Sequence, residues 1–245
     1  MPKINSPFRY PGGKSQLSPY IKHLLQVNDI KGTYIEPFAG GAGVAIDLLL
    51  NNDVEQIVIN DYDKSIHSAW NAIINHSEEL TEFIRETPVS FEGWLIQKNI
   101  HEQNKEDQNS IPGGLATFYL NRTNVSGIIK GGPIGGKNQT GKYKIDARFN
   151  KKSLIDKIEL ISKYRDNIIL MNEDANNLAR IIKKEFIPAD TFIFFDPPYY
   201  AQGKNLYMSF IDSSEHQKLF DNIQTLNEYK WIVTYDTAPE IKVGS

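Results

Sequence analysis

Five short apolar runs, most of them followed by a helical pattern, constrain the fold of this 245-residue chain more than any other feature. Such runs are typical of strands that are buried on both faces of a parallel sheet, with helices as the crossover connections. The predicted strands are TYIEPF at 33–38, EQIVIND at 55–61, NIILMNE at 167–173, TFIFFD at 191–196 and KWIVTYD at 230–236. The sequence therefore predicts an α/β fold with a Rossmann-like sheet covered by helices on both faces.

The segment between the second and third predicted strands, residues 76–164, is too long for a simple crossover. It carries the helical patterns SEELTEFIRE, GWLIQKNIHEQ, GLATFYLNRT and SLIDKIELISKY. Between the last two lies a Gly- and Lys-rich stretch from Val125 to Arg148, which indicates a long loop or an irregular hairpin. We expect a mostly helical insertion over residues 76–164, and a sheet domain formed by residues 1–75 and 165–245.

Charge is distributed unevenly along the chain. The segment from Arg122 to Lys152 holds eight basic residues and one acid, a net charge of +7, whereas the whole chain carries −3. Clustered Lys and Arg side chains bind nucleic-acid phosphates. A solvated basic loop is the alternative interpretation of this segment.

Composition excludes several kinds of site. Cysteine is absent, which rules out disulfides and thiolate metal sites, and the five histidines are scattered, so we expect no metal. No apolar run approaches the roughly 18 residues of a membrane helix, and no apolar signal core follows the N-terminus. These features predict a cytoplasmic protein without a membrane segment.

The stretch RYPGGKSQL, residues 9–17, contains Gly-Lys-Ser, the letters in which a nucleotide phosphate loop ends. However, Phe8 stands where that motif requires its first glycine, and the upstream MPKINSP contains two prolines and no strand-like run. A nucleotide hydrolase is therefore rejected. A surface turn made by Pro-Gly-Gly remains the alternative to a ligand-binding segment.

Ligands of open parallel sheets bind beyond the carboxyl ends of the strands, and the first two predicted strands carry unusual residues there. The first strand runs into EPFAGGAG at 36–43, whose glycines allow a tight turn and a close approach of a ligand to the backbone. The second ends at Asp61, 25 positions after Glu36. An acid at this place either hydrogen-bonds ribose hydroxyls or caps the following helix.

The fourth predicted strand ends in FFDPPYY at 194–200, the most specific signal in the chain. The two prolines break the strand and fix the backbone beyond Asp196 in an extended path. The Asp196 carboxylate and the Pro197 carbonyl are then two neighbouring acceptors, with the ring of Tyr199 close by. Two acceptors and an aromatic face suit the exocyclic amine of a nucleobase that has been drawn out of its stack.

Several of these segments, in this order, resemble the D12-class DNA adenine-N6 methyltransferases, the Dam-like enzymes: FRYPGGK, EPFAGGAG, NDYD, FYLNRT with SGI, GKYKIDARFN and DPPY. The resemblance covers most of the chain. It implies S-adenosylmethionine as methyl donor and adenine in double-stranded DNA as acceptor. It also implies a site-specific enzyme of a restriction-modification, phage or housekeeping methylation system, encoded by a bacterium or a phage.

The resemblance also implies roles for individual residues, with the inserted lobe as the target-recognition region. The expected catalytic residues, which accept the amine protons and stack on the adenine, are Asp196, Pro197 and Tyr199. The expected cofactor-binding residues are Tyr10, Lys14, Phe38, Gly40, Asp61 and Asp196. The expected DNA-binding residues are Arg122, Asn124, Ser126, Lys137, Lys142 and Lys144.

The sequence departs from this family near its C-terminus. The chain stops at Ser245, soon after the last predicted strand, where the family usually continues, so we expect the C-terminal strands to be missing. An incomplete sheet exposes an edge, which predicts a monomer or a weak dimer through that edge. Two alternatives stay open: an N4-cytosine methyltransferase, a class that more often carries Ser at the position of Asp196, and a truncated, non-catalytic DNA-binding module.

Overall fold

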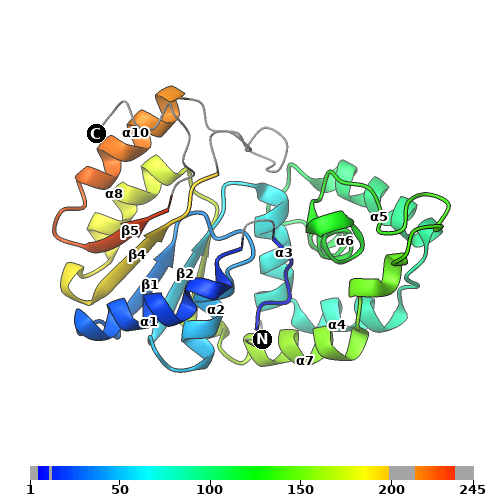
Figure 1. Ribbon diagram of the computed structural model, residues 1–245, viewed down its shortest axis with the longest axis horizontal. Coiled ribbons are helices and arrows are strands. Elements are labelled where there is room, and N and C mark those ends of the chain that lie inside the picture. The colour runs from blue at the N-terminus through cyan, green and yellow to red at the C-terminus, as the bar shows by residue number, and fades with distance from the viewer. Residues whose placement is uncertain (1–4, 11–12, 199–212, 235–245) are drawn as a thin grey trace.

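A computed structural model describes residues 5–10, 13–198 and 213–234, and Figure 1 shows a sheet domain beside a helical lobe. The described strands form one sheet in the order β3-β2-β1-β4-β5, with every neighbouring pair parallel. The strands are β1 (Thr33–Glu36), β2 (Gln56–Asn60), β3 (Ile168–Met171), β4 (Thr191–Phe195) and β5 (Lys230–Val233). This arrangement confirms the predicted α/β fold, and each strand begins within one residue of the apolar run that predicted it.

The two faces of the sheet bury alternate residues of each strand. On one face, Ile57 and Ile59 of β2 pack under the helices α1 (Ser18–Val27), α2 (Gly43–Leu50) and α3 (Lys64–Asn75). On the other face, Val58 packs under α8 (Ala175–Glu185) and α10 (Ser213–Gln224). Burial on both faces explains why the strands are continuous apolar runs in the sequence.

The insertion forms a lobe of helices next to α3 (Figure 1). Its helices are α4 (Ser77–Glu86), α5 (Phe91–Asn104), α6 (Ile111–Thr123) and α7 (Lys151–Ser162). The segment between α6 and α7 is irregular apart from two short 3-10 turns, η2 (Val125–Gly127) and η3 (Ile145–Arg148), as the sequence predicted. The apolar core of this lobe is continuous with that of the sheet domain, because Phe8 stacks on Trp70 of α3 and meets Phe118 of α6 edge to face.

Residues 5–10, which we call the N-terminal strap, connect the sheet domain to the lobe. On the sheet side, the Ser6 hydroxyl donates a 2.6 Å hydrogen bond to the Gly41 carbonyl. On the lobe side, the Arg9 backbone N–H donates to the Asn121 side-chain oxygen at 2.8 Å, and the Asn121 amide donates back to the Arg9 carbonyl at 2.6 Å. The strap therefore holds both parts in one arrangement.

Two further observations concern surfaces. Among the described helices, none has the length and apolar character that crossing a bilayer requires. β5 is an edge strand of the described sheet, and a weak dimer through this edge stays a prediction.

Candidate active site

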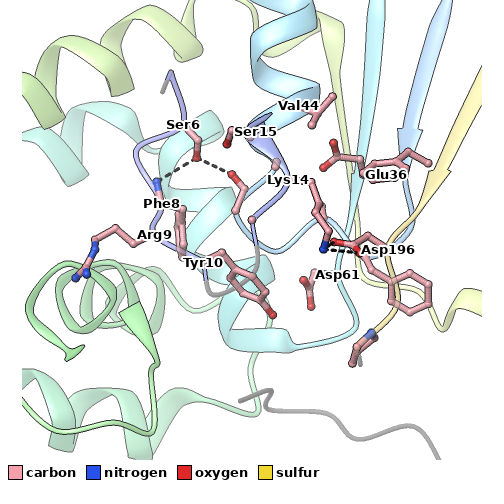
Figure 2. A pocket seen from close by; sticks show the side chains of 18 of the residues that line it. Ser6, Phe8, Arg9, Tyr10, Lys14, Ser15, Glu36, Val44, Asp61 and Asp196 are labelled. Carbon is pink, nitrogen blue, oxygen red and sulfur yellow. Dashed lines mark hydrogen bonds and ion pairs between the residues drawn. The ribbon is translucent and has the colours of Figure 1, made fainter. Parts of the chain in front are cut away.

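A cavity of about 680 Å³ lies at the carboxyl ends of β1, β2 and β4, between the sheet and the N-terminal strap. Figure 2 shows the side chains of 18 of the residues that line it. The parallel register places the residues that follow the three strands at one edge of the sheet. The cavity therefore brings together the three sequence segments that follow these strands, and adds the strap as its cover.

The glycine-rich turn after β1 forms one wall of the cavity. Gly40 and Ala42 have φ values of +47° and +44°, a left-handed conformation that glycine adopts without strain. A Cβ atom at Gly40 would lie 2.7 Å from the ring of Tyr10, so only glycine allows this ring to lie against the turn. The Trp70 Nε1–H of α3 donates to the Gly40 carbonyl at 2.8 Å, and this hydrogen bond helps to hold the turn in place. Tyr10 and Gly40 were both predicted as cofactor-binding residues. Tyr10 lines the cavity and lies against Gly40, whose neighbours Ala39 and Gly41 line it as well.

Asp61 lies at the end of β2 and lines the cavity, as its position in the sequence predicted. Its carboxylate accepts the backbone N–H groups of Gly40 at 2.9 Å and of Asp63 at 3.0 Å. Burial raises the pKa of Asp61 to about 7, with a smaller contribution from the neighbouring charge of Asp63. The residue that caps the following helix, α3, is Asp63 and not Asp61: the Asp63 side chain accepts from the N–H groups of Ser65 and Ile66.

Glu36 is a buried acid of the cavity that the sequence analysis did not assign to the site. It is the last residue of β1, and its carboxylate accepts from the Tyr34 hydroxyl at 3.1 Å and from the Ala45 N–H at 3.0 Å. Burial raises its pKa to about 8. A charged residue at the last position of a strand that is buried on both faces is the sequence signal that identifies it.

Asp196 follows β4 and pairs with Lys14 of the opposite wall (Figure 2). The Lys14 ammonium lies 2.9 Å from each of the two carboxylate oxygens. The register of β4 against β5 pairs Phe195 with Val233, which places Thr234 beside Asp196. The Thr234 hydroxyl donates to the Asp196 Oδ1 at 2.5 Å. Lys14 was predicted as a cofactor-binding residue, and in the structure its ammonium pairs with the Asp196 carboxylate.

Three further predicted residues, the cofactor-binding Phe38 and the catalytic Pro197 and Tyr199, lie in different situations. Phe38 lines the cavity and packs partly against the apolar cluster under α8. Pro197 is buried directly after Asp196, and Pro198 lines the cavity. Tyr199 lies outside the described residues, so its stacking role stays a prediction.

Two of the predicted DNA-binding residues make internal contacts. The Asn124 side chain is fully buried; it accepts from the Trp94 Nε1–H at 2.6 Å and donates to the carbonyls of Ile128 and Ile129. We therefore revise its expected role from DNA contact to support of the loop after α6, because a side chain with no exposed surface cannot reach a phosphate or a base. The Arg122 guanidinium lines the cavity and donates to the backbone carbonyls of Arg148 and Pro7.

The other predicted DNA-binding residues are exposed on the loop between α6 and α7. Ser126 lines the cavity and has a φ of +57°. Lys137, Lys142 and Lys144 are exposed, and the Lys144 ammonium donates to the Gln139 carbonyl at 2.6 Å. Within the described residues, no group of three or more His, Asp or Glu side chains could hold a metal ion.

Comparison with known proteins places these features in one family. The sequence model of the D12 class of N6 adenine-specific DNA methyltransferases matches residues 10–243. The type II methyltransferase M.MjaIII of Methanocaldococcus jannaschii is 26% identical over 209 residues, which cover 80% of this chain and 69% of that protein. The type II methyltransferase M1.LlaDCHI of Lactococcus lactis subsp. cremoris is 28% identical over 207 residues, covering 80% and 67% of the two chains. The DNA adenine methylase of Escherichia coli is 23% identical over 205 residues, covering 81% and 66%.

Proposed function

Because the chain belongs to the D12 class of N6 adenine-specific DNA methyltransferases, we propose that it methylates N6 of an adenine turned out of double-stranded DNA, with S-adenosylmethionine as donor. The observation that carries this proposal is the cavity itself. It joins the Asp196 carboxylate, the Asp61 carboxylate and the Gly40 turn, three separate segments of the chain, around one space of about 680 Å³. That space suits a nucleoside-sized ligand and a base together.

The residues present fit the proposed donor. Its sulfonium and ammonium groups are cations, and the sheet side of the cavity carries the acids Glu36, Asp61 and Asp196. The Tyr10 ring, which lies against the left-handed Gly40 turn, offers an aromatic face to a cation. We propose that Asp61 binds the ribose hydroxyls, since its oxygens line the cavity and have acceptor capacity beyond two backbone N–H groups.

When bound, S-adenosylmethionine supplies an electrophilic methyl group on a positively charged sulfur. The role of the protein's own residues would then be to hold the adenine amine in line with that methyl group. The amine is a weak nucleophile because its lone pair is delocalised into the ring. Hydrogen bonds from its protons to Asp196 and to the Pro197 carbonyl favour a pyramidal nitrogen, with the lone pair free to attack. Positioning of this kind contributes several kcal/mol, of the order of 7–11 kcal/mol in well-aligned intramolecular reactions.

The contacts of Asp196 indicate which of its oxygens receives the amine. Oδ1 accepts from both Lys14 and Thr234, whereas Oδ2 accepts from Lys14. A carboxylate oxygen accepts about two hydrogen bonds. Among the contacts of the described residues, Oδ2 therefore has capacity for one more donor, and we assign the amine proton to it. Lys14 and Thr234 are positioning residues for this carboxylate.

The lobe supplies the DNA-facing side. The exposed Lys137, Lys142 and Lys144, together with Ser126 at the cavity, lie on the loop between α6 and α7. Their positive charge is suited to phosphate contacts, which add affinity without sequence information. The relatives named type II methyltransferases support a place for this chain in a restriction-modification system.

The test is a transfer assay with methyl-labelled S-adenosylmethionine and unmethylated duplex DNA, followed by nucleoside analysis. We expect the label in N6-methyladenine. An Asp196→Ala variant should lose the transfer while keeping its fold, measured by circular dichroism. Label in N4-methylcytosine would select the cytosine alternative, and DNA binding without cofactor binding would select the non-catalytic module. A fully active Asp196→Ala variant would overturn the mechanism.

A further inference from the structure

Three arginines from distant parts of the chain meet at the lobe side of the cavity. Arg9 comes from the N-terminal strap, Arg122 from the last turn of α6, and Arg148 from the end of η3, and all three line the cavity. Figure 2 shows Arg9 extending away from Lys14 and Asp196, toward the lobe. The acids of the cavity lie at the ends of the strands. The cavity thus has an acidic wall at the sheet and a basic wall at the lobe.

Two of the three guanidinium groups, those of Arg9 and Arg122, are held by backbone carbonyls instead of carboxylates. Arg122 donates from Nε and Nη2 to the Arg148 carbonyl, at 2.9 and 2.5 Å, and from Nη1 to the Pro7 carbonyl at 3.3 Å. Arg9 donates from Nη1 to the Asn124 carbonyl at 3.0 Å. Arg148 lies over the ring of Tyr143, with 5.8 Å between its Cζ and the ring centroid. None of the ion pairs formed by described residues includes any of these arginines.

The charges of these arginines oppose one another. Burial lowers the pKa of Arg122 to about 10, and the charges of Arg9 and Arg148 contribute in the same direction. Burial and the charge of Arg148 also lower the pKa of Arg9. Like charges that lie close together with no carboxylate paired to them are destabilising until an anion binds between them. Guanidinium groups are also the side chains best shaped to hold a phosphate through paired N–H donors.

We propose that Arg9, Arg122 and Arg148 form a binding site for one phosphodiester of the DNA backbone, the one next to the adenine that enters the cavity. This inference rests on the proposed function. The location follows from the cavity, because a base that reaches Asp196 at one wall brings its own backbone phosphate toward the opposite wall. A nucleotide bound in this way spans both walls, with its base amine at the acid and its phosphate at the arginines. The carboxylate of S-adenosylmethionine is the other anion that could bind there, and the test separates the two.

Arg148→Gln is the variant of choice, because the Arg148 guanidinium donates no hydrogen bond within the described structure and its loss leaves the carbonyl contacts of Arg122 in place. Arg180→Gln is the matched control: it removes the same charge from an exposed position of α8. DNA affinity is measured over a series of salt concentrations. We expect the slope of log affinity against log salt to fall by about 0.9 for Arg148→Gln, with about tenfold weaker binding, and to stay unchanged for Arg180→Gln. Equal slopes for wild type and Arg148→Gln would overturn the site.

Neutral methylphosphonates, placed one at a time along the duplex, locate the contact. We expect wild type to lose about tenfold in affinity at the phosphate beside the methylated adenine, and Arg148→Gln to lose nothing further there. Equal losses for both proteins at every position would overturn the proposed location. Weaker binding of S-adenosylmethionine by Arg148→Gln without DNA, measured by calorimetry, would assign the arginines to the cofactor carboxylate instead. Formation of N6-methyladenine by wild type is recorded in parallel, so that failure of this inference is distinguished from failure of the proposed function.

Discussion

The Lys14 ammonium binds both oxygens of the Asp196 carboxylate at 2.9 Å, across 182 positions of sequence. This pair joins the N-terminal segment to the end of β4 and closes the cavity between them (Figure 2). Both side chains are about one-fifth exposed. The pair is therefore partly desolvated, and a charge left alone there is more costly than at the surface.

Replacement of Lys14 by Met should lower kcat strongly while leaving cofactor affinity within a few-fold. Met keeps most of the side-chain volume but removes the donor that orients Asp196. We expect a decrease in kcat of about 100-fold, the scale on which loss of one preorganised electrostatic contact acts. Single-turnover methyl transfer and calorimetry with S-adenosylmethionine measure the two quantities separately.

The control for this change is Lys22→Met, which breaks a 2.6 Å ion pair with Asp53 outside the cavity. We expect its kcat to equal that of wild type, because a partly exposed pair of this kind contributes about 1 kcal/mol or less to stability. If Lys14→Met lost cofactor affinity instead of kcat, Lys14 would belong to the donor carboxylate and not to Asp196.

Thr234→Val should slow the transfer by about tenfold, with KM for DNA unchanged. The substitution keeps the branched shape but removes the hydroxyl that donates to the Asp196 Oδ1. Thr234→Ser restores the donor and should restore most of the rate. A Val variant as fast as wild type, or a Ser variant as slow as Val, would contradict the positioning role.

The fold was predictable because its strands are buried on both faces. Ile57, Val58 and Ile59 pack alternately into two apolar clusters, so the strand is apolar at every position and stands out in the sequence. Helix α1 was not predicted. It buries Ile21 and Leu25 but exposes Tyr20 and Val27, which weakens its periodic pattern.

The sequence predicted those site residues whose place in the fold follows from their position next to the end of a strand. Asp61 and Gly40 lie at strand ends, and the parallel register alone brings such positions together. The burial of Asn124 depends on Trp94 of a different helix, and the partner of Lys14 follows β4, 182 positions away in the sequence. Contacts of this kind arise from tertiary packing, and a single sequence does not contain them.

Gly40→Ala should destabilise the protein by about 1–3 kcal/mol and weaken cofactor binding. The φ of +47° is strained for a residue with a side chain, and the new Cβ would lie 2.7 Å from the Tyr10 ring. Gly132→Ala is the matched control, because nothing lies within 4 Å of a Cβ at that position, and it should change stability by about 0.5 kcal/mol or less. Urea unfolding of both variants measures the difference.

Adding Tyr10→Ala to Gly40→Ala separates the two causes. Removal of the ring relieves the steric part, whereas the backbone strain remains, so the double variant should be more stable than the sum of the single changes predicts. Strict additivity would show that the Tyr10 ring does not lie against the turn.

Glu36→Gln should flatten the dependence of stability on pH. Burial raises the pKa of Glu36 from 4.5 to about 8, so between these values the folded protein holds a proton that the unfolded chain has lost. The free energy of unfolding therefore falls as pH rises through this window, by a few kcal/mol at most, at about 1.4 kcal/mol per pKa unit. Gln cannot titrate and removes the contribution of Glu36 to this decline, leaving that of Asp61. The exposed Glu55→Gln should leave the whole decline unchanged. Urea unfolding at pH 5 to 9, without cofactor, makes the comparison.

Binding of S-adenosylmethionine at pH 7 should release protons from the acidic wall of the cavity. The pKa of Asp61 is raised to about 7 and that of Glu36 to about 8, so both carboxyls are partly or largely protonated before binding. A cation placed beside them favours their ionised forms and lowers both pKa values. Calorimetry in two buffers of different ionisation enthalpy measures the released protons directly, without any methyl transfer. Glu36→Gln should release fewer protons than wild type, and equal heats in the two buffers would show that the donor's cations do not face these acids.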